Sequence, residues 1–82
     1  MRFRTQSHTV AHPAGADLIL VNLTTNRMFA ANETGAAIWD AIARGDDVAD
    51  MKARIAAEAA DAGPDVDAFL ALLVDEGLIE PA

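Results

Sequence analysis

The sequence contains no cysteine among its 82 residues. This absence excludes disulfides, thiolate metal sites, iron–sulfur clusters and cysteine nucleophiles, and it fits a reducing compartment. The longest run of large apolar residues, Leu18 to Val21, is far shorter than the ~20 residues that a membrane helix needs. Polar residues follow Met1-Arg2-Phe3-Arg4, where a signal peptide would have an apolar stretch. We therefore expect a cytoplasmic protein that does not associate with membranes.

Side chains that could carry catalysis are equally scarce. The only serine is Ser7 and the only histidines are His8 and His12. Ser7 and His8 are adjacent in a predicted strand, so their side chains point to opposite faces and cannot form a nucleophile–base pair. His8 and His12 would lie about 13 Å apart at ~3.3 Å per residue, too far to share a metal, and we expect both to be solvated. Helix capping accounts for the acidic group Asp46, Asp47 and Asp50. The sequence predicts no enzyme, no metal site and no cofactor.

The net charge of −7 is distributed unevenly. Residues 1–39 carry a net charge of +1, and residues 40–82 carry −8. An acidic surface repels phosphate backbones, whereas nucleic-acid-binding proteins present a basic stripe. Nucleic acid is therefore an unfavourable partner, and the acidic half is interpreted as a solvated surface.

The chain length allows one small domain, residues 1–82, with a modest core. The hydrophobic fraction is 52%, but 19 of these residues are alanine and only 24 are Val, Ile, Leu, Met, Phe or Trp. Residues 3–10 are β-prone, and Pro13-Ala14-Gly15 forms a turn. Leu18–Leu23 is apolar on both faces and predicts the central strand of a sheet. Thr24-Thr25-Asn26 connects it to a short strand, Arg27–Ala31, which we place on the edge of a three-stranded antiparallel sheet.

Three helices are expected after the strands. Asn32 caps the first helix, which places Gly35, Ile38, Trp39 and Ile42 on one face and ends at Gly45. Asp46 or Asp47 caps the second helix, and Ala62-Gly63-Pro64 ends it. The third helix runs from about Pro64 or Asp65 to Glu76, and Gly77 ends it so that Leu78-Ile79 can dock on the core. The fold class predicted is α+β, in the order β-β-β-α-α-α.

Two features remain without a structural explanation. The strand Arg27–Ala31 has an open edge, which is a row of unpaired N–H and C=O groups that an extended peptide can complete. Leu72 lies on a face of the third helix that should be polar, beside Asp65, Ala68 and Glu76. Together they suggest a groove for a peptide.

The segment from Leu20 to Trp39, LVNLTTNRMFAANETGAAIW, resembles the signature of PqqD-like proteins. These proteins are also called precursor-peptide recognition elements of ribosomally made, modified peptides. The segment Phe69–Ile79, FLALLVDEGLI, resembles the closing helix of that family. Two positions depart from the family pattern: Ala31 replaces a usual leucine, and Leu72 stands where a polar residue is common.

The resemblance implies a winged helix-turn-helix-like domain without catalytic activity. It would bind the leader of a precursor peptide as an added strand between the third strand and the third helix, and deliver the precursor to modifying enzymes. The partner enzymes would be a leader protease and a cyclase, as in lasso-peptide pathways, or a radical SAM enzyme; we favour the lasso type. The peptide-binding residues carried over by position are Arg27, Met28, Phe29, Ala30, Ala31, Asp65, Val66, Phe69, Leu72, Leu73 and Glu76.

One alternative is a winged-helix regulator that binds DNA through its third helix. That helix carries Asp65, Asp67, Asp75 and Glu76 without any Lys or Arg, which disfavours an approach to phosphates. An enzyme subunit or a toxin–antitoxin component are further alternatives.

Overall fold

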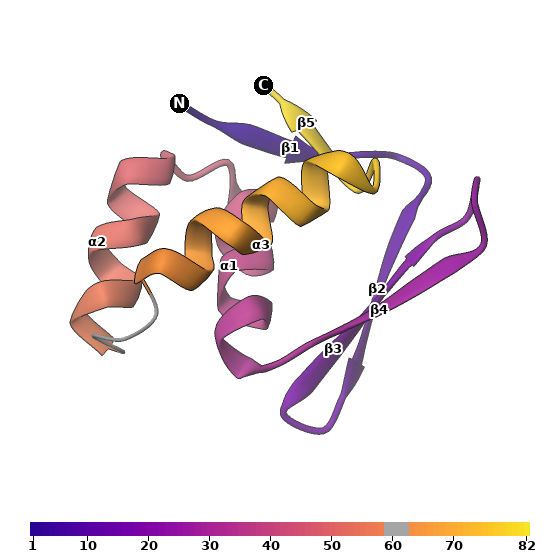
Figure 1. Ribbon diagram of the computed structural model, residues 1–82, viewed down its shortest axis with the longest axis horizontal. Helices are drawn as coiled ribbons and strands as arrows, with labels where there is room; N and C mark the ends of the chain where they lie inside the picture. Colours follow the sequence, from indigo (N-terminus) through magenta and orange to yellow (C-terminus); the bar gives the residue numbers. More distant parts are fainter. Residues whose placement is uncertain (59–62) are drawn as a thin grey trace.

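A computed structural model describes residues 1–58 and 63–82 of the chain. It is an α+β fold with a three-stranded antiparallel sheet followed by three helices, as predicted (Figure 1). The elements in chain order are β1 (Phe3–Thr5), β2 (Thr9–Ala14), β3 (Asp17–Asn22), β4 (Arg27–Ala31), α1 (Glu33–Arg44), α2 (Val48–Glu58), α3 (Gly63–Asp75) and β5 (Ile79–Pro81).

The main sheet has the strand order β2-β3-β4, and all its pairs are antiparallel. The apolar strand β3 lies at the centre, which confirms the prediction from its two apolar faces. Leu18, Leu20 and Asn22 of β3 are buried against the helices, and the residues between them are half-buried on the outer face. The strand that precedes α1 therefore lies at an edge of the sheet.

A second, two-stranded sheet was not predicted. The segment 3–10 is not one strand, because a turn at Ser7-His8 divides it and sends β1 away from the main sheet. The turn predicted at Pro13-Ala14-Gly15 lies later than expected: Pro13 and Ala14 belong to β2, and the turn is formed by Gly15 and Ala16. β1 pairs with β5, which brings the two ends of the chain side by side (Figure 1). The expectation that His8 is solvated is also wrong: its Nε2 lies 2.8 Å from the carbonyl oxygen of Gly77. His8 helps to hold the turn against the end of α3.

Helix α1 forms the centre of the molecule. The side chain of Asn32 caps it by accepting a hydrogen bond from the Gly35 N–H (2.9 Å), and Gly45 ends it with φ of 79°. The predicted apolar face of α1 is the buried one, and Trp39 is only 6% exposed. α1 contacts β3 and β4 of the main sheet, β1 of the second sheet, and both other helices.

Helices α2 and α3 complete the core. Asp47, not Asp46, caps α2 through its Oδ1, which accepts from the Ala49 N–H (2.9 Å). Gly63 and Pro64 belong to the first turn of α3, while Ala62 lies outside the described residues. Helix α3 ends at Asp75 and Gly77 follows with φ of 71°, so Leu78 turns back into the core as expected. Across residues 1–58 and 63–82, no helix has the length and apolar character needed to span a membrane.

A buried asparagine fixes the end of α3 against the sheet. The Nδ2 of Asn22 donates to the carbonyl oxygen of Glu76 (2.8 Å), and its Oδ1 accepts from the N–H groups of Thr24 and Thr25. One side chain thus connects the end of β3, the β3–β4 turn and the residue that follows α3. This contact sets the distance between α3 and the sheet edge where the candidate site lies.

Candidate functional site

The register of the sheet shows which backbone groups of β4 are unpaired. The N–H of Leu23 donates to the carbonyl oxygen of His8 (2.9 Å), so Leu23 is hydrogen-bonded on the β2 side. Neighbouring residues of a strand bond to opposite sides, so Leu20 and Asn22 bond toward β4. Their β4 partners are Phe29 and Arg27. By the same alternation Leu18 bonds to Ala31. The N–H and C=O groups of Met28 and Ala30, which alternate with the bonded residues, therefore point to the open edge.

The opposite edge of the sheet is far less able to accept a strand. By the same alternation, Thr9, Ala11 and Pro13 of β2 face outward. Pro13 has no N–H, and the N–H of Thr9 already donates to the carbonyl oxygen of Gln6 (3.1 Å). Proline is a common means of protecting an edge strand. β4 carries no such protection, so an added strand would pair with β4.

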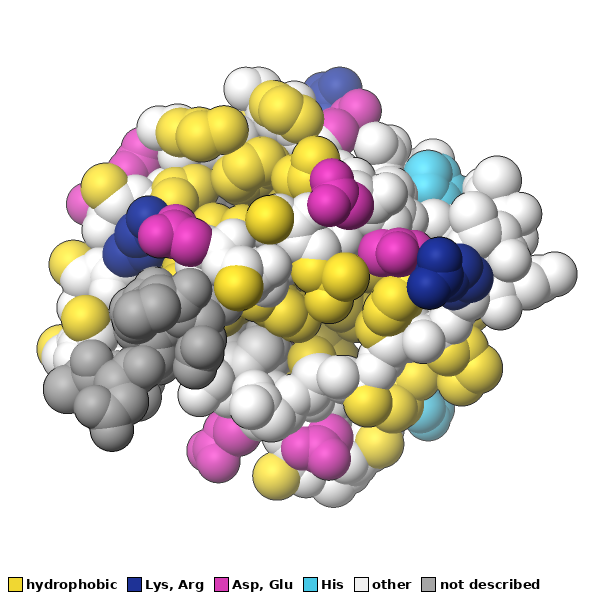
Figure 2. Space-filling model, in the orientation of Figure 1, with side chains coloured by type: hydrophobic (Ala, Val, Ile, Leu, Met, Phe, Trp, Pro, Cys, Tyr) yellow, Lys and Arg dark blue, Asp and Glu magenta, His cyan; other side chains and the backbone are white. Residues whose placement is uncertain are grey.

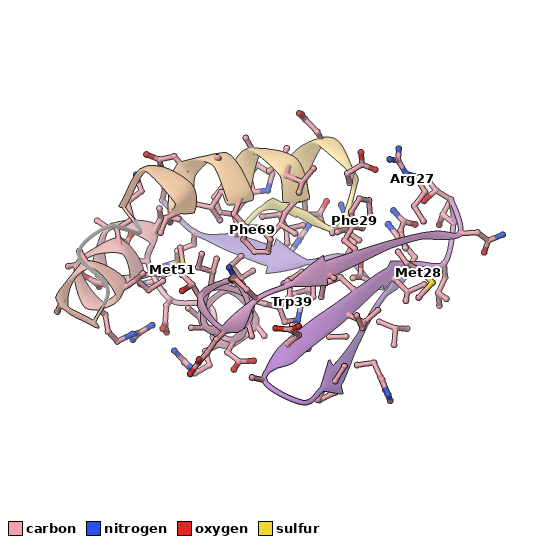
Figure 3. The ribbon with its side chains drawn as sticks, turned by 60° about the horizontal axis from the view of Figure 1, so that its bottom comes forward. Arg27, Met28, Phe29, Trp39, Met51 and Phe69 are labelled. Atoms are coloured by element: carbon pink, nitrogen blue, oxygen red, sulfur yellow. The ribbon has the colours of Figure 1, made fainter. Side chains whose placement is uncertain are left out.

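The side chains of β4 alternate between two environments (Figure 3). Met28 points away from α3 and is 67% exposed. Phe29 lies on the α3 side and packs half-buried against the core. The Arg27 guanidinium lies 5.5 Å from the centre of the Phe29 ring and forms an ion pair with the Glu76 carboxylate (3.1 Å). Arg27 and Glu76 therefore connect β4 to α3 at one end of the open edge.

A hollow of about 340 Å³ lies beyond the other end of β4, between α1 and α3. Figure 2 shows hydrophobic side chains gathered in the depression below α3. The residues that line this hollow are Asn32, Thr34, Gly35, Ile38, Ala68, Phe69 and Leu72. Most of its wall is apolar, and Leu72 remains 42% exposed at its rim. The hollow can receive an apolar side chain from a ligand that lies along β4.

Gly35 is required where α1 passes the end of β4. A Cβ at this position would lie 2.9 Å from the Cβ of Ala31 and 3.3 Å from Cζ of Phe69. The close approach explains why glycine is present inside a helix despite its low helix propensity. It confirms the prediction that another element packs closely there, and it explains why a small residue, Ala31, stands at the end of β4.

The predicted site residues fall into three groups. The side chains of Arg27, Phe29, Phe69, Leu72 and Glu76 lie on the accessible surface of the groove or at its ends, whereas Met28 and Ala30 contribute their backbone groups to the open edge and direct their side chains to the outer face. Val66 and Leu73 have no exposed surface and Ala31 is buried, so these three lie beneath the groove as part of the core. The side chain of Asp65 lies outside the described residues.

Sequence reasoning did not place five of the residues that line the hollow at a site: Asn32, Thr34, Gly35, Ile38 and Ala68. Asn32, Gly35 and Ile38 were assigned only structural roles. The glycine inside α1 was the available signal, since it indicated a close approach between elements. The hollow itself depends on how α1 and α3 pack, which sequence periodicity does not specify.

Two acidic residues at the start of α2, Asp46 and Asp47, form ion pairs and hydrogen bonds with neighbouring groups of the chain. The Arg54 and Arg44 guanidinium groups hydrogen-bond to Asp46 and hold the pKa of its carboxyl below the ordinary value. The terminal ammonium group and the Ala49 N–H lower the pKa of Asp47 in the same way. Within the described residues, no group of three or more His, Asp or Glu side chains is arranged to hold a metal ion. Asp47 therefore caps α2 as expected, whereas Asp46 forms ion pairs with two arginines instead of capping the helix.

Comparison with known protein families shows to which family this chain belongs. The family described as Coenzyme PQQ synthesis protein D (PqqD) matches residues 17–79. The chain belongs to the PqqD family. This match covers β3, β4, the three helices and the start of β5, so it includes every element that forms the groove. The resemblance drawn from the two sequence segments is thereby confirmed. A search of curated proteins returned no match.

Two solved structures share the fold of this PqqD-family protein. One, described as "TbiB1 in Complex with the TbiA(beta) Leader Peptide", has a TM-score of 0.83 and 22% identity, and the match covers 96% of each chain. The other, "Lasso peptide synthetase B1 complexed with the leader peptide", has a TM-score of 0.84 and 21% identity. That match covers 99% of this chain and 100% of the other. The similarity extends over nearly the whole of all three chains.

Proposed function

We propose that this protein binds the leader of a ribosomally made precursor peptide and presents it to the enzymes that modify the precursor. The leader adds to β4 as a fourth strand of the main sheet, in the groove below α3. The observation that carries this proposal is the unprotected edge of β4 next to an apolar hollow. The backbone groups of Met28 and Ala30 supply hydrogen bonds, and Phe69 and Leu72 supply apolar contacts.

Three further considerations support the proposal. The chain belongs to the PqqD family, and the two structural neighbours are described as complexes with leader peptides. Among the described residues that line the hollow, Thr34 is the one hydroxyl and none is a His, Asp, Glu or Lys, so the lining is suited to binding an apolar side chain. α3 carries no Lys or Arg, which disfavours the alternative role as a DNA-reading helix.

We infer that the partner enzymes are a leader protease and a cyclase of the lasso-peptide type, because one structural neighbour is described as a lasso peptide synthetase B1 and the match covers 99% of this chain and 100% of that one. A radical SAM enzyme is the alternative partner, which the family name supports. Since these enzymes act on newly made peptides, the proposed location is the cytoplasm. Residues 1–82 then act as one leader-recognition domain.

Titration with a synthetic leader tests the function. The probes are synthetic peptides that correspond to the N-terminal parts of short reading frames near this chain's gene, labelled for fluorescence anisotropy. We expect a Kd on the order of 0.1–10 μM, because main-chain hydrogen bonds and a few apolar contacts supply about −7 to −9.5 kcal/mol. Leu72→Asp places a charge at the rim of the hollow and should weaken binding at least tenfold while leaving the melting temperature unchanged.

Val74→Asp is the matched control. Val74 also lies on α3 and is 40% exposed, close to the 42% of Leu72, but it does not line the hollow. The control should bind the leader like the parent. If the two variants bind equally well, the groove below α3 is not the binding site.

A further inference from the structure

The alternation of side chains on β4 determines what kind of peptide the groove accepts. A residue of an added strand points to the same face of the sheet as the β4 residue directly opposite to it. Peptide residues opposite Phe29 and Arg27 therefore point toward α3, whereas those opposite Met28 and Ala30 point to the outer face with the exposed Met28 side chain. Only alternate residues of the peptide can be selected by the groove.

The inward positions differ sharply in chemistry. The peptide residue opposite Ala31 lies nearest the hollow lined by Phe69 and Leu72, and the residue opposite Phe29 faces an aromatic ring. Both environments favour apolar side chains. The residue opposite Arg27 instead meets a guanidinium group at the end of the open edge. Within five consecutive peptide residues, the groove thus favours apolar side chains at the first and third positions and a charged side chain at the fifth.

Arg27 can bind a second carboxylate. A guanidinium has five N–H donors, and the ion pair with Glu76 engages one of its nitrogen atoms, Nη1. The Arg27 side chain is 61% exposed, whereas that of Glu76 is 19% exposed and its backbone is fixed by Asn22. The existing pair thus holds the guanidinium in place beside β4 and leaves donors directed to solvent. A carboxylate from the peptide can occupy those donors.

We propose that the groove selects a peptide with the pattern apolar-x-apolar-x-acidic, read from its N-terminus, and that Arg27 determines the acidic position. This inference rests on the proposed function. The direction follows from antiparallel addition, which matches the other pairs of the main sheet and is the more stable arrangement per residue. In that direction the first apolar residue lies at the hollow, and the acidic residue lies where the peptide leaves the groove beside Arg27 and Glu76.

Selection from a random library tests the pattern without a known leader. Phage-displayed random 12-residue peptides are panned on the whole chain, and the enriched peptides are synthesised with Asp or Asn at the acidic position. Replacement of Asp by Asn should weaken binding to the parent protein about three- to tenfold. The difference should disappear in Arg27→Gln and shrink at 0.5 M NaCl, because the interaction is an ion pair near the surface.

Arg4→Gln is the matched control, because Arg4 also forms an exposed ion pair, with Glu80, but lies in β1, which belongs to the other sheet. It should retain the preference for Asp, and melting curves should show that both variants are folded. The inference is wrong if peptides with alternate apolar residues are enriched but the Asp and Asn versions bind the parent protein with equal affinity. It is also wrong if Arg27→Gln still binds the Asp version more tightly. In both cases the proposal that a peptide adds to β4 as a strand is unaffected. If every enriched peptide binds the Leu72→Asp variant as tightly as it binds the parent, the proposed function is wrong, and the inference is wrong with it.

Discussion

Trp39 should be the side chain whose loss costs this small fold the most. It is 6% exposed and lies on α1, which contacts the sheet, α2 and α3 together. A buried tryptophan covers about 150–250 Å² of surface, and truncation of such a residue to alanine typically costs about 3–5 kcal/mol, because transfer energy is lost and a cavity remains. A domain of this length has a total stability of about 4–12 kcal/mol. Trp39→Ala therefore removes about a quarter or more of the stability.

Thermal unfolding measures this loss. At about 4–8 °C per kcal/mol for a domain of this size, the melting temperature of Trp39→Ala should fall by about 12–40 °C. Circular dichroism at 222 nm is the suitable signal, since the variant has no tryptophan to report by fluorescence. Asp40→Ala, at the neighbouring exposed position, should change stability by no more than about 0.5 kcal/mol. A melting temperature for Trp39→Ala within 3 °C of the parent would show that α1 does not pack as described.

Two further substitutions test local features of the fold. Asn32→Ala removes the cap whose Oδ1 accepts from the Gly35 N–H, and it should lower the free energy of unfolding in urea by about 1 kcal/mol; an unchanged midpoint would mean that this cap contributes nothing. The lowered pKa of Asp46 means that its ion pairs with Arg54 and Arg44 stabilise the fold above the unfolded-state pKa, and that this contribution is lost as the pH falls through the lowered value. Asp46→Asn should therefore have a lower melting temperature than the parent at pH 7, and this difference should shrink as the pH falls below 3.8, the ordinary pKa of the carboxyl. A difference that does not change with pH would exclude ionisation as the cause.

The hairpin that carries the site was predictable because its signals are local. The bounds of β4 follow from the turn Thr24-Thr25-Asn26 before it and from the capping residue Asn32 after it. Both signals lie within a few residues of the strand, and neither depends on the rest of the chain. The position of β3 at the sheet centre follows from apolar residues on both of its faces.

The features that were not predicted depend on contacts between distant parts of the chain. β5 is three residues long and forms only because Phe3–Thr5 lies beside it, so no periodic pattern marks it. His8 contacts Gly77, 69 positions away. The hollow beside Leu72 and the identity of the open-edge residues Met28 and Ala30 require the packing of α3 and the register of the sheet. Sequence pattern alone specifies neither.

Amide hydrogen exchange at β4, measured by NMR with and without the leader, tests strand addition most directly. In the free protein, the Phe29 N–H should exchange slowly because it bonds to β3, while the N–H groups of Met28 and Ala30 should exchange rapidly. With saturating leader, exchange at Met28 and Ala30 should slow at least tenfold, because these donors then bond to the added strand. If the leader is bound and exchange at both residues is unchanged, the peptide does not add to the edge of β4.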